Sequence, residues 1–228
     1  MDLAGALHYK RMVRPLIDEL PAIRAEVSRL NIGFLIADSL GPACGFEAEG
    51  TGAAIQAMNA LRACGPTVTR LALAHVSKAM ADNVRAAARP FGSVFVQNLA
   101  RSTWEVRGVQ EGHTLTSVLY DRKENDAPKR FGPIAYRFSF GPGHISVDSG
   151  DLNDAPVLRR GASLGFQILT ALAGGPKTTG EMVEDLEKTA ETIGRTCRRL
   201  VKADKMIRLE DVKTGRGHET RWALKADT

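Results

Sequence analysis

Long apolar runs are missing from this 228-residue sequence, and cysteine is scarce. No stretch reaches the roughly 20 apolar residues of a membrane-spanning helix, and the first residues lack the apolar core of a secretory signal peptide. Cys44, Cys64 and Cys197 lie far apart and form no pair at metal-ligand spacing. These absences argue against membrane proteins and disulfide-stabilised secreted proteins, and they predict a cytoplasmic protein with reduced thiols.

The composition is that of a globular protein, with 43% hydrophobic and 25% charged residues. The net charge of +5 is unevenly placed: residues 1–156 hold 17 Lys and Arg against 16 Asp and Glu, whereas residues 157–228 hold 14 against 10. The basic carboxyl-terminal part favours a polyanionic partner, although so small a surplus is weak evidence. A cluster of Asp, Gly, Asn and Pro at 148–163 predicts a linker between two domains, 1–150 and 157–228.

The first domain alternates apolar runs with helical patterns. Residues 31–38 are typical of a strand buried on both faces of a parallel sheet, and a second such strand is expected within 67–78. The spacing of apolar residues predicts helices over 9–30, where Pro21 would break or kink the helix, and over 50–65. This alternation predicts an α/β fold, with a parallel sheet and flanking helices.

Three further strand regions are expected after the second strand. Residues 92–108 and 113–123 each fit a strand, and residues 134–149 fit a hairpin with Gly-Pro-Gly in its turn.

Polar residues follow the apolar runs at several strand ends. Asp38 and Ser39 follow the first run, the segment from His75 to Lys78 follows the second, and Arg101 and Lys123 follow later ones. Nucleotide hydrolysis needs an acid for Mg²⁺, a polar sensor and cations for phosphate charge. Each residue alone is better explained as a helix cap, a structural histidine or a surface cation. Their order along the chain is what favours a nucleotide site.

Four segments, at residues 33–45, 71–83, 89–107 and 121–128, together resemble the later motifs of RecA-like ATPases. The resemblance is strongest to the hexameric helicase type of plasmid RepA proteins and to related AAA-family ATPases, and it covers about residues 8–140. It implies a partial RecA-like sheet, ATP and Mg²⁺ as cofactors, DNA as a partner, and a ring of subunits, a hexamer in this family, that acts in replication or recombination.

The resemblance also implies roles for particular residues. Asp38 matches the Walker B acid, which acts on Mg²⁺ through water, and Ser39 and Lys78 would lie with it at the nucleotide. His75 matches the residue that senses the γ-phosphate and couples it to the DNA-facing loops.

Two more implied roles concern the neighbouring subunit. Arg101 matches the arginine finger that reaches the neighbour's nucleotide, and Lys123 would be a second cation at that interface. Residues 79–92 correspond to a region that often carries a DNA-binding loop in this family.

One essential motif is absent. The phosphate-binding loop G-x-x-x-x-G-K-[ST] does not precede Asp38, and the segment 174–180, GGPKTTG, fails because Pro176 separates Gly175 from Lys177. We therefore expect that this chain alone does not hydrolyse ATP. It reads as the later half of an ATPase domain, from a truncated or mis-started gene or as a natural remnant.

The second domain has a different pattern. Helices are expected over 163–176, 178–188 and 189–205, followed by a hairpin over 206–225. Three helices and a basic hairpin resemble a winged helix-turn-helix, a small DNA-binding domain. In that fold the third helix would enter the major groove, and the wing would meet phosphate. The expected DNA-binding residues are Arg195, Arg198, Arg199 and Lys202 on the helix, with Lys213, Arg216 and Arg221 on the wing.

Protein contact is the competing interpretation for this domain. Winged helices also serve as interaction modules, and acids on the same side would repel DNA; these are Glu181, Glu184, Asp185, Glu187 and Glu191. Three hypotheses therefore stay open. The chain is a helicase-type ATPase subunit without its phosphate-binding half, a non-catalytic winged-helix DNA-binding or regulatory protein, or a degenerate subunit that lends Arg101 to an intact homologue.

Overall fold

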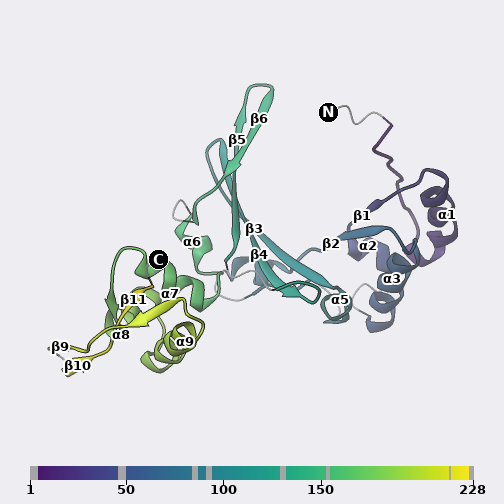
Figure 1. The fold of residues 1–228 in the computed structure, drawn as a ribbon. Helices are drawn as coiled ribbons and strands as arrows, with labels where there is room; N and C mark the ends of the chain where they lie inside the picture. Colours follow the sequence, from purple (N-terminus) through teal and green to yellow (C-terminus); the bar gives the residue numbers. More distant parts are fainter. Residues whose placement is uncertain are drawn as a thin grey trace. The chain divides into compact units, whose positions relative to one another are not determined.

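The computed structural model describes residues 5–45, 50–83, 87–90, 94–128, 132–152, 155–215 and 217–225 (Figure 1). The fold is mixed α/β, with helices and several separate sheets. The chain divides into two units, Met1–Glu105 with Arg122–Pro128, and Val106–Asp121 with Lys129–Thr228. The linker expected at 148–163 lies within the second unit.

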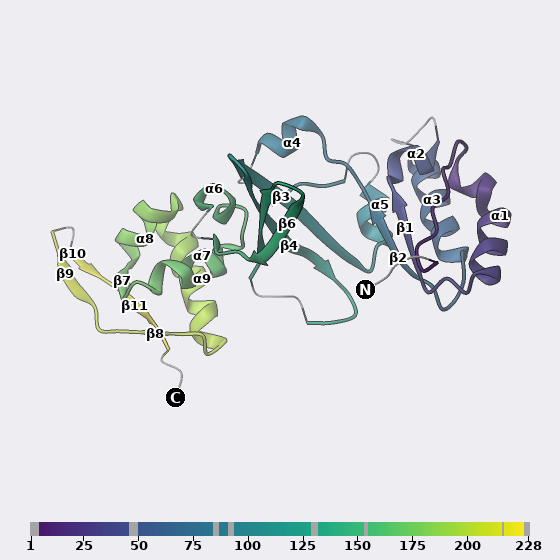
Figure 2. The same ribbon diagram turned by 90° about the horizontal axis from the view of Figure 1, so that it is seen from above.

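The first unit is built around two parallel strands. Its first five elements are α1 (Leu16–Arg29), β1 (Phe34–Asp38), α2 (Leu40–Cys44), α3 (Thr51–Ala63) and β2 (Thr69–Leu73). The strands pair in parallel from Phe34 opposite Thr69 to Asp38 opposite Leu73, and α1 and α3 lie on the same side of them (Figure 2). The core forms between helices and strands, from residues such as Leu16, Ile23, Ala54 and Leu61.

The expectation that these strands are buried on both faces is wrong. Leu35, Ala37 and Ala72 pack against the helical core, but the alternate side chains are 42–53% exposed; these are Phe34, Ile36, Leu71 and Leu73. Both rows are apolar, so the sequence anticipates two covering layers. The described residues supply a helical layer for one face only.

Pro21 does not end α1. The helix runs from Leu16 to Arg29 with Pro21 inside it. Pro21 removes one backbone donor, and the rest of α1 keeps Leu16, Glu19 and Ile23 buried against the core. Packing of this face therefore outweighs the cost of the proline.

The region expected as a third strand, residues 92–108, forms a helix followed by a strand. Two short helices, α4 (Lys78–Asp82) and α5 (Val94–Leu99), precede four strands; these are β3 (Ser102–Glu111), β4 (Thr114–Glu124), β5 (Ile134–Gly141) and β6 (His144–Ser149). Val96 of α5 is buried in the core of the first unit, so tertiary packing decides the helix.

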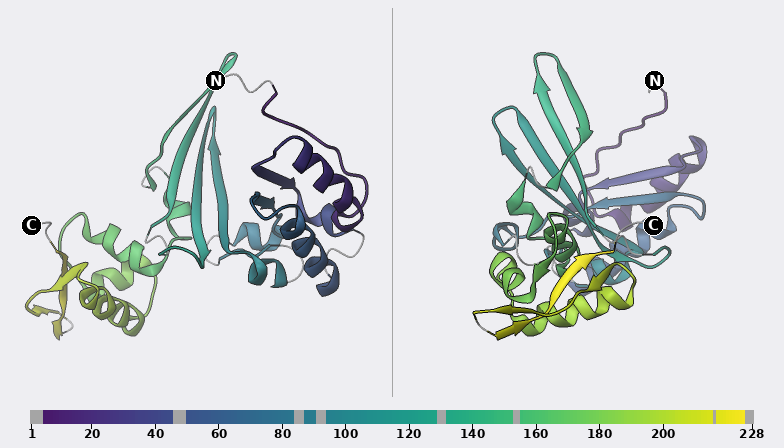
Figure 3. Two further views of the ribbon diagram at one scale, coloured as in Figure 1. Left: turned by 45° about the vertical axis from the view of Figure 1, so that its right-hand side comes forward. Right: turned by 60° about the vertical axis from the view of Figure 1, so that its left-hand side comes forward.

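The four strands form an antiparallel sheet in the order β3-β4-β5-β6. The expected hairpin at 134–149 is confirmed, since β5 and β6 pair from Tyr136 opposite Ser149 to Gly141 opposite His144 (Figure 3). Gly143 in its turn has a φ of 72°, a conformation that glycine adopts without strain. Parallel pairing in the described part of the chain is confined to β1 and β2.

The carboxyl-terminal part begins with α6 (Pro156–Arg159) and continues with α7 (Leu164–Leu172), β7 (Lys177–Thr178), α8 (Thr179–Leu186), α9 (Ala190–Lys202), β8 (Met206–Arg208), β9 (Val212–Thr214), β10 (Gly217–Glu219) and β11 (Arg221–Leu224). The three expected helices and the final hairpin are confirmed, since β11 pairs with β8 in antiparallel register. Side-chain oxygens of Ser163, Thr178 and Thr189 cap α7, α8 and α9. The helices enclose a core that includes Ile168, Met182, Ile193 and Trp222.

Tyr120 of β4 joins the antiparallel sheet to this part. Its hydroxyl donates to the carbonyl of Leu158 in α6, and its ring lies in a small core with Val118 and Ala135. Among the described helices, none is long and apolar enough to cross a bilayer.

Candidate functional site

The outer face of α9 carries a group of cations. Ile193, Cys197 and Leu200 point into the core, and burial raises the pKa of the Cys197 thiol to about 11. The helical period of 3.6 residues then turns the polar residues outward. The exposed cations are Arg195, Arg198, Arg199 and Lys202.

None of these four cations takes part in an ion pair within the described ranges. Other cations of the same part are paired: Lys177 lies 2.8 Å from Asp185, and Arg208 lies 3.0 Å from Asp211. The face of α9 is therefore positive and available to a polyanion.

The acids that could oppose DNA are mostly engaged elsewhere. Glu181 accepts a hydrogen bond from the Thr178 backbone at 2.6 Å and completes a capping box. The hydrogen bond from Lys177 to Asp185 raises the pKa of Lys177, and Glu187 lies 3.7 Å from Arg160. Glu191 sits in the first turn of α9, where a negative charge stabilises the helix.

A shallow hollow opens beside this face, between α9 and the strands β8 and β11. Arg198, Arg208 and Trp222 line it, together with Val201 and Thr220. The sequence pattern does not single out Arg208, because it is tertiary packing, and not local spacing, that brings it to the same hollow as Arg198. Arg208 in this hollow is paired with Asp211, so Arg198 is its cation without an ion pair among the described residues.

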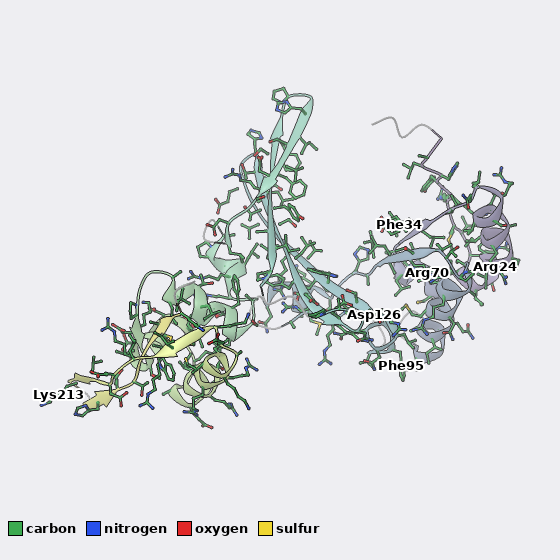
Figure 4. The ribbon with its side chains drawn as sticks, viewed as in Figure 1. Arg24, Phe34, Arg70, Phe95, Asp126 and Lys213 are labelled. Carbon is green, nitrogen blue, oxygen red and sulfur yellow. The ribbon has the colours of Figure 1, made fainter. Side chains whose placement is uncertain are left out.

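The wing residues are placed unequally. Lys213 is exposed on β9, in the β9–β10 ribbon (Figure 4), and Arg221 is half-buried in β11 opposite Thr178. Arg216 lies outside the described residues. Lys213 is thus the wing cation that the structure makes available.

The predicted nucleotide residues gather at one edge of the parallel pair. Because β1 and β2 run in the same direction with Asp38 opposite Leu73, Ser39 and His75 follow at the same edge, and Lys78 begins α4 shortly after. The peptide bond between Asp38 and Ser39 is cis. Asp38, His75 and Lys78 are exposed, and in the described part of the chain no hydrogen bond or ion pair engages their side chains.

This set of groups does not by itself fit Mg²⁺ and ATP. Asp38 supplies one carboxylate and Ser39 one hydroxyl, and nowhere among the described residues do three His, Cys, Asp or Glu side chains gather as a metal site. Tight binding of nucleotide phosphates also needs a loop of backbone amides at a helix N-terminus, which the sequence lacks before β1. Asp38 could only complete a site whose main phosphate contacts come from other polypeptide.

Arg101 lies between α5 and β3, with its side chain 74% exposed. Its guanidinium approaches the Asp126 carboxylate at 3.5 Å, and its carbonyl accepts a hydrogen bond from the Asn125 amide at 3.1 Å. No hydrogen bond or ion pair of the described chain joins Arg101 to Asp38 or His75. An arginine with an exposed side chain and one long, exposed ion pair can exchange that pair for a contact with another molecule.

Lys123 lies next to this arginine but points inward. Its ammonium donates to three backbone carbonyls at the end of α5, those of Gln97, Asn98 and Ala100, at 3.1, 2.8 and 2.7 Å. An ammonium has three N–H donors, so these contacts use its full capacity. Lys123 thus fastens α5 to β4 immediately before Arg101, which gives it a positioning role in this structure.

Comparisons of the chain with protein-family models, with curated proteins and with solved structures find no match. The resemblance to RecA-like ATPases therefore stays a prediction.

Proposed function

We propose that this chain is a DNA-binding subunit of a RecA-like, helicase-type ATPase that acts in replication or recombination, and that it does not hydrolyse ATP alone. The observation that carries the proposal is the face of α9, where four exposed cations have no acidic partner among the described residues. This face lies on α9, and the order of α7, α8, α9 and the strands that follow resembles that of a winged helix-turn-helix, which supports the proposal.

The negative phosphates of duplex DNA are complementary in charge to the cationic face of α9. We place α9 in the major groove, where arginine can pair with guanine edges, and Lys213 of the wing at a phosphate. The engagement of Glu181, Asp185 and Glu187 in local contacts supports DNA over a purely protein partner.

The first unit would contribute to an ATPase site shared between polypeptides. Asp38, with Ser39 and Lys78 nearby, would act on Mg²⁺ and nucleotide held by a phosphate-binding loop from elsewhere, with His75 as the sensor. Arg101 would reach a neighbouring subunit's nucleotide, so the natural partners are further copies or an intact homologous subunit in a ring, a hexamer by resemblance. Free thiols at all three cysteines suit a cytoplasmic location.

Fluorescence anisotropy with a labelled duplex tests the DNA part. Counterion release should dominate, so affinity should fall steeply between two salt concentrations. Changing Arg195, Arg199 and Lys202 to Ala should weaken binding by about 100-fold or more, because each neutralises phosphate charge. A matched control removes three exposed cations elsewhere, by changing Arg11, Arg24 and Arg137 to Ala. Equal binding by the two triple variants would overturn the proposal.

Isothermal calorimetry tests the nucleotide part. We expect no tight binding of Mg-ATP to the chain alone, since the phosphate cradle is missing from the sequence. Sub-micromolar affinity would contradict this expectation.

The second candidate function is a non-catalytic winged-helix DNA-binding or regulatory protein. It is favoured by the donor set at Asp38, which forms no cluster of three metal-ligating side chains among the described residues. Mixing with a subunit that carries a phosphate-binding loop separates the two candidates. Arg101→Ala should lower the ATPase rate of the mixture if Arg101 acts in trans, and should leave it unchanged if the chain is only a DNA-binding protein.

A further inference from the structure

The strand β6 is one of the two edge strands of the antiparallel sheet (Figure 3). All six of its residues are exposed, and Ile145 and Val147 are 60% and 53% exposed. Natural edge strands are commonly protected by lysine, proline or a bulge. The sequence HISVDS contains no lysine or proline, and its one carboxylate is Asp148.

The backbone of β6 presents hydrogen-bonding groups to this edge. The amide of Phe140 donates to His113 on the β4 side, so the neighbouring residues Ser139 and Gly141 face β6. Their partners Ser146 and His144 face back toward β5. The intervening Ile145 and Val147 therefore direct their N–H and C=O groups away from the sheet.

We propose that β6 pairs in antiparallel orientation with β6 of a second copy of this chain, about a two-fold axis at Ser146. In this register Ile145 of each copy lies opposite Val147 of the other, so outward-directed backbone groups meet outward-directed ones. Each apolar side chain gains an apolar neighbour on the same face of the joined sheet.

The polar face of β6 is complementary in the same register. His144 of each copy lies opposite Asp148 of the other, which brings an imidazole ring next to a carboxylate; its Nδ1 contacts the Pro142 carbonyl of its own copy at 3.2 Å, so Nε2 is the ring nitrogen left to face Asp148. Asp148 of one copy therefore does not lie opposite Asp148 of the other, so like charges are kept apart. Ser146 faces Ser146 on the axis.

Other registers lose these matches. Moving the axis to Val147 pairs Val147 with Val147 of the other copy but places both Ile145 side chains opposite Ser149, so one apolar pair replaces two. A shift by one residue would bring the apolar face of one copy against the polar face of the other. The contact is isologous and closes after two copies. It is independent of the proposed ATPase ring.

Disulfide trapping tests the register. Ser146→Cys should give a covalent dimer under mild oxidation, since Cα atoms in a non-hydrogen-bonded antiparallel pair lie about 4.5 Å apart, within disulfide range. The matched control is Ser149→Cys, on the same exposed strand. In the proposed register residue 149 of one copy lies opposite residue 143 of the other, so the two introduced cysteines are six residues apart along the strand, about 20 Å, and should not cross-link. The parent chain, oxidised in the same way, shows whether Cys44, Cys64 or Cys197 forms any cross-link. Cross-linking at both positions, or at neither, would overturn the register.

Sedimentation velocity tests the edge contact without a cross-link. Val147→Pro removes an N–H that points to the free edge and leaves the bonds to β5 in place, so dimerisation should weaken at least 10-fold. Val147→Lys should act in the same direction by blunting the edge, and it serves if the proline variant does not fold by circular dichroism. The proposal would be refuted if the parent chain stayed monomeric in a concentration series of 100-fold steps that reaches about 100 μM. It would also be refuted if neither variant weakened the dimer.

Discussion

The parallel pair β1–β2 and the helical part around α9 expose opposite kinds of side chain. On the strands the uncovered row is apolar and includes Phe34 and Ile36. On α9 the uncovered face is cationic, and its apolar face is buried against α7 and α8. The helical part completes its own core, whereas the strand pair has a second apolar face that no described element covers. The exposed face of α9 therefore suits a polar partner, and the exposed face of the strand pair suits an apolar one.

The largest contrast should come from the core of the helical part. Ile193→Ala should lower the free energy of unfolding by about 2–5 kcal/mol, because it leaves a cavity at a fully buried site. Urea unfolding followed by Trp222 fluorescence measures this, in a Trp104→Phe background that leaves Trp222 as the single tryptophan. A loss below 1 kcal/mol would mean that this core is looser than its burial suggests.

The Lys123 contact should give the next largest effect. Lys123→Met keeps the aliphatic stem but removes three charged hydrogen bonds, and it should cost about 1–2 kcal/mol after allowance for partial exposure. Hydrogen exchange at the end of α5 should become faster. Lys78→Met is the control, since that ammonium is exposed and should not change exchange in α5. Unchanged exchange in the Lys123 variant would remove its positioning role.

Loss of the capping box at α8 should be smaller. Thr178→Ala removes the side-chain oxygen that accepts the Glu181 amide, and the expected cost is about 1 kcal/mol. Thr178→Ser keeps that oxygen and should restore most of the stability in the same urea experiment. Equal losses in both variants would point to the β7 pairing rather than the cap.

The smallest effect is expected on the uncovered row. Phe34→Thr should change the free energy of unfolding by no more than about 0.5 kcal/mol, as at other exposed sites, and should reduce binding of the dye ANS. A loss comparable with that of Ile193→Ala would erase the contrast, because it would show that Phe34 is covered in solution.

The sequence predicts those features that depend on local pattern. The spacing of Ile193, Cys197 and Leu200 is enough to place α9 and to turn its cations outward. The apolar runs ending at Asp38 and before His75 are likewise enough to anticipate two neighbouring strand ends.

Features that depend on distant partners could not be read in this way. Val94, Phe95 and Val96 favour a strand by propensity, yet the burial of Val96 among residues of other helices makes α5. The partners of Lys123 are backbone carbonyls 23–26 residues away, which leave no trace in the sequence. The apolar character of Phe34 and Ile36 indicates burial but not which polypeptide provides it.

The buried thiols allow the opening rates of the two regions to be measured and compared. Cys64 lies in the core of the first unit and Cys197 in that of the helical part, and burial raises the pKa of both thiols. With a pKa of about 11, only on the order of one in a thousand Cys197 side chains would be thiolate at pH 8 while the thiol stays buried. Labelling of each cysteine by a thiol reagent therefore waits for its own core to open. The labelling rates of Cys64 and Cys197 therefore report separately how often each core opens, and mass spectrometry of the two labelled peptides measures both rates.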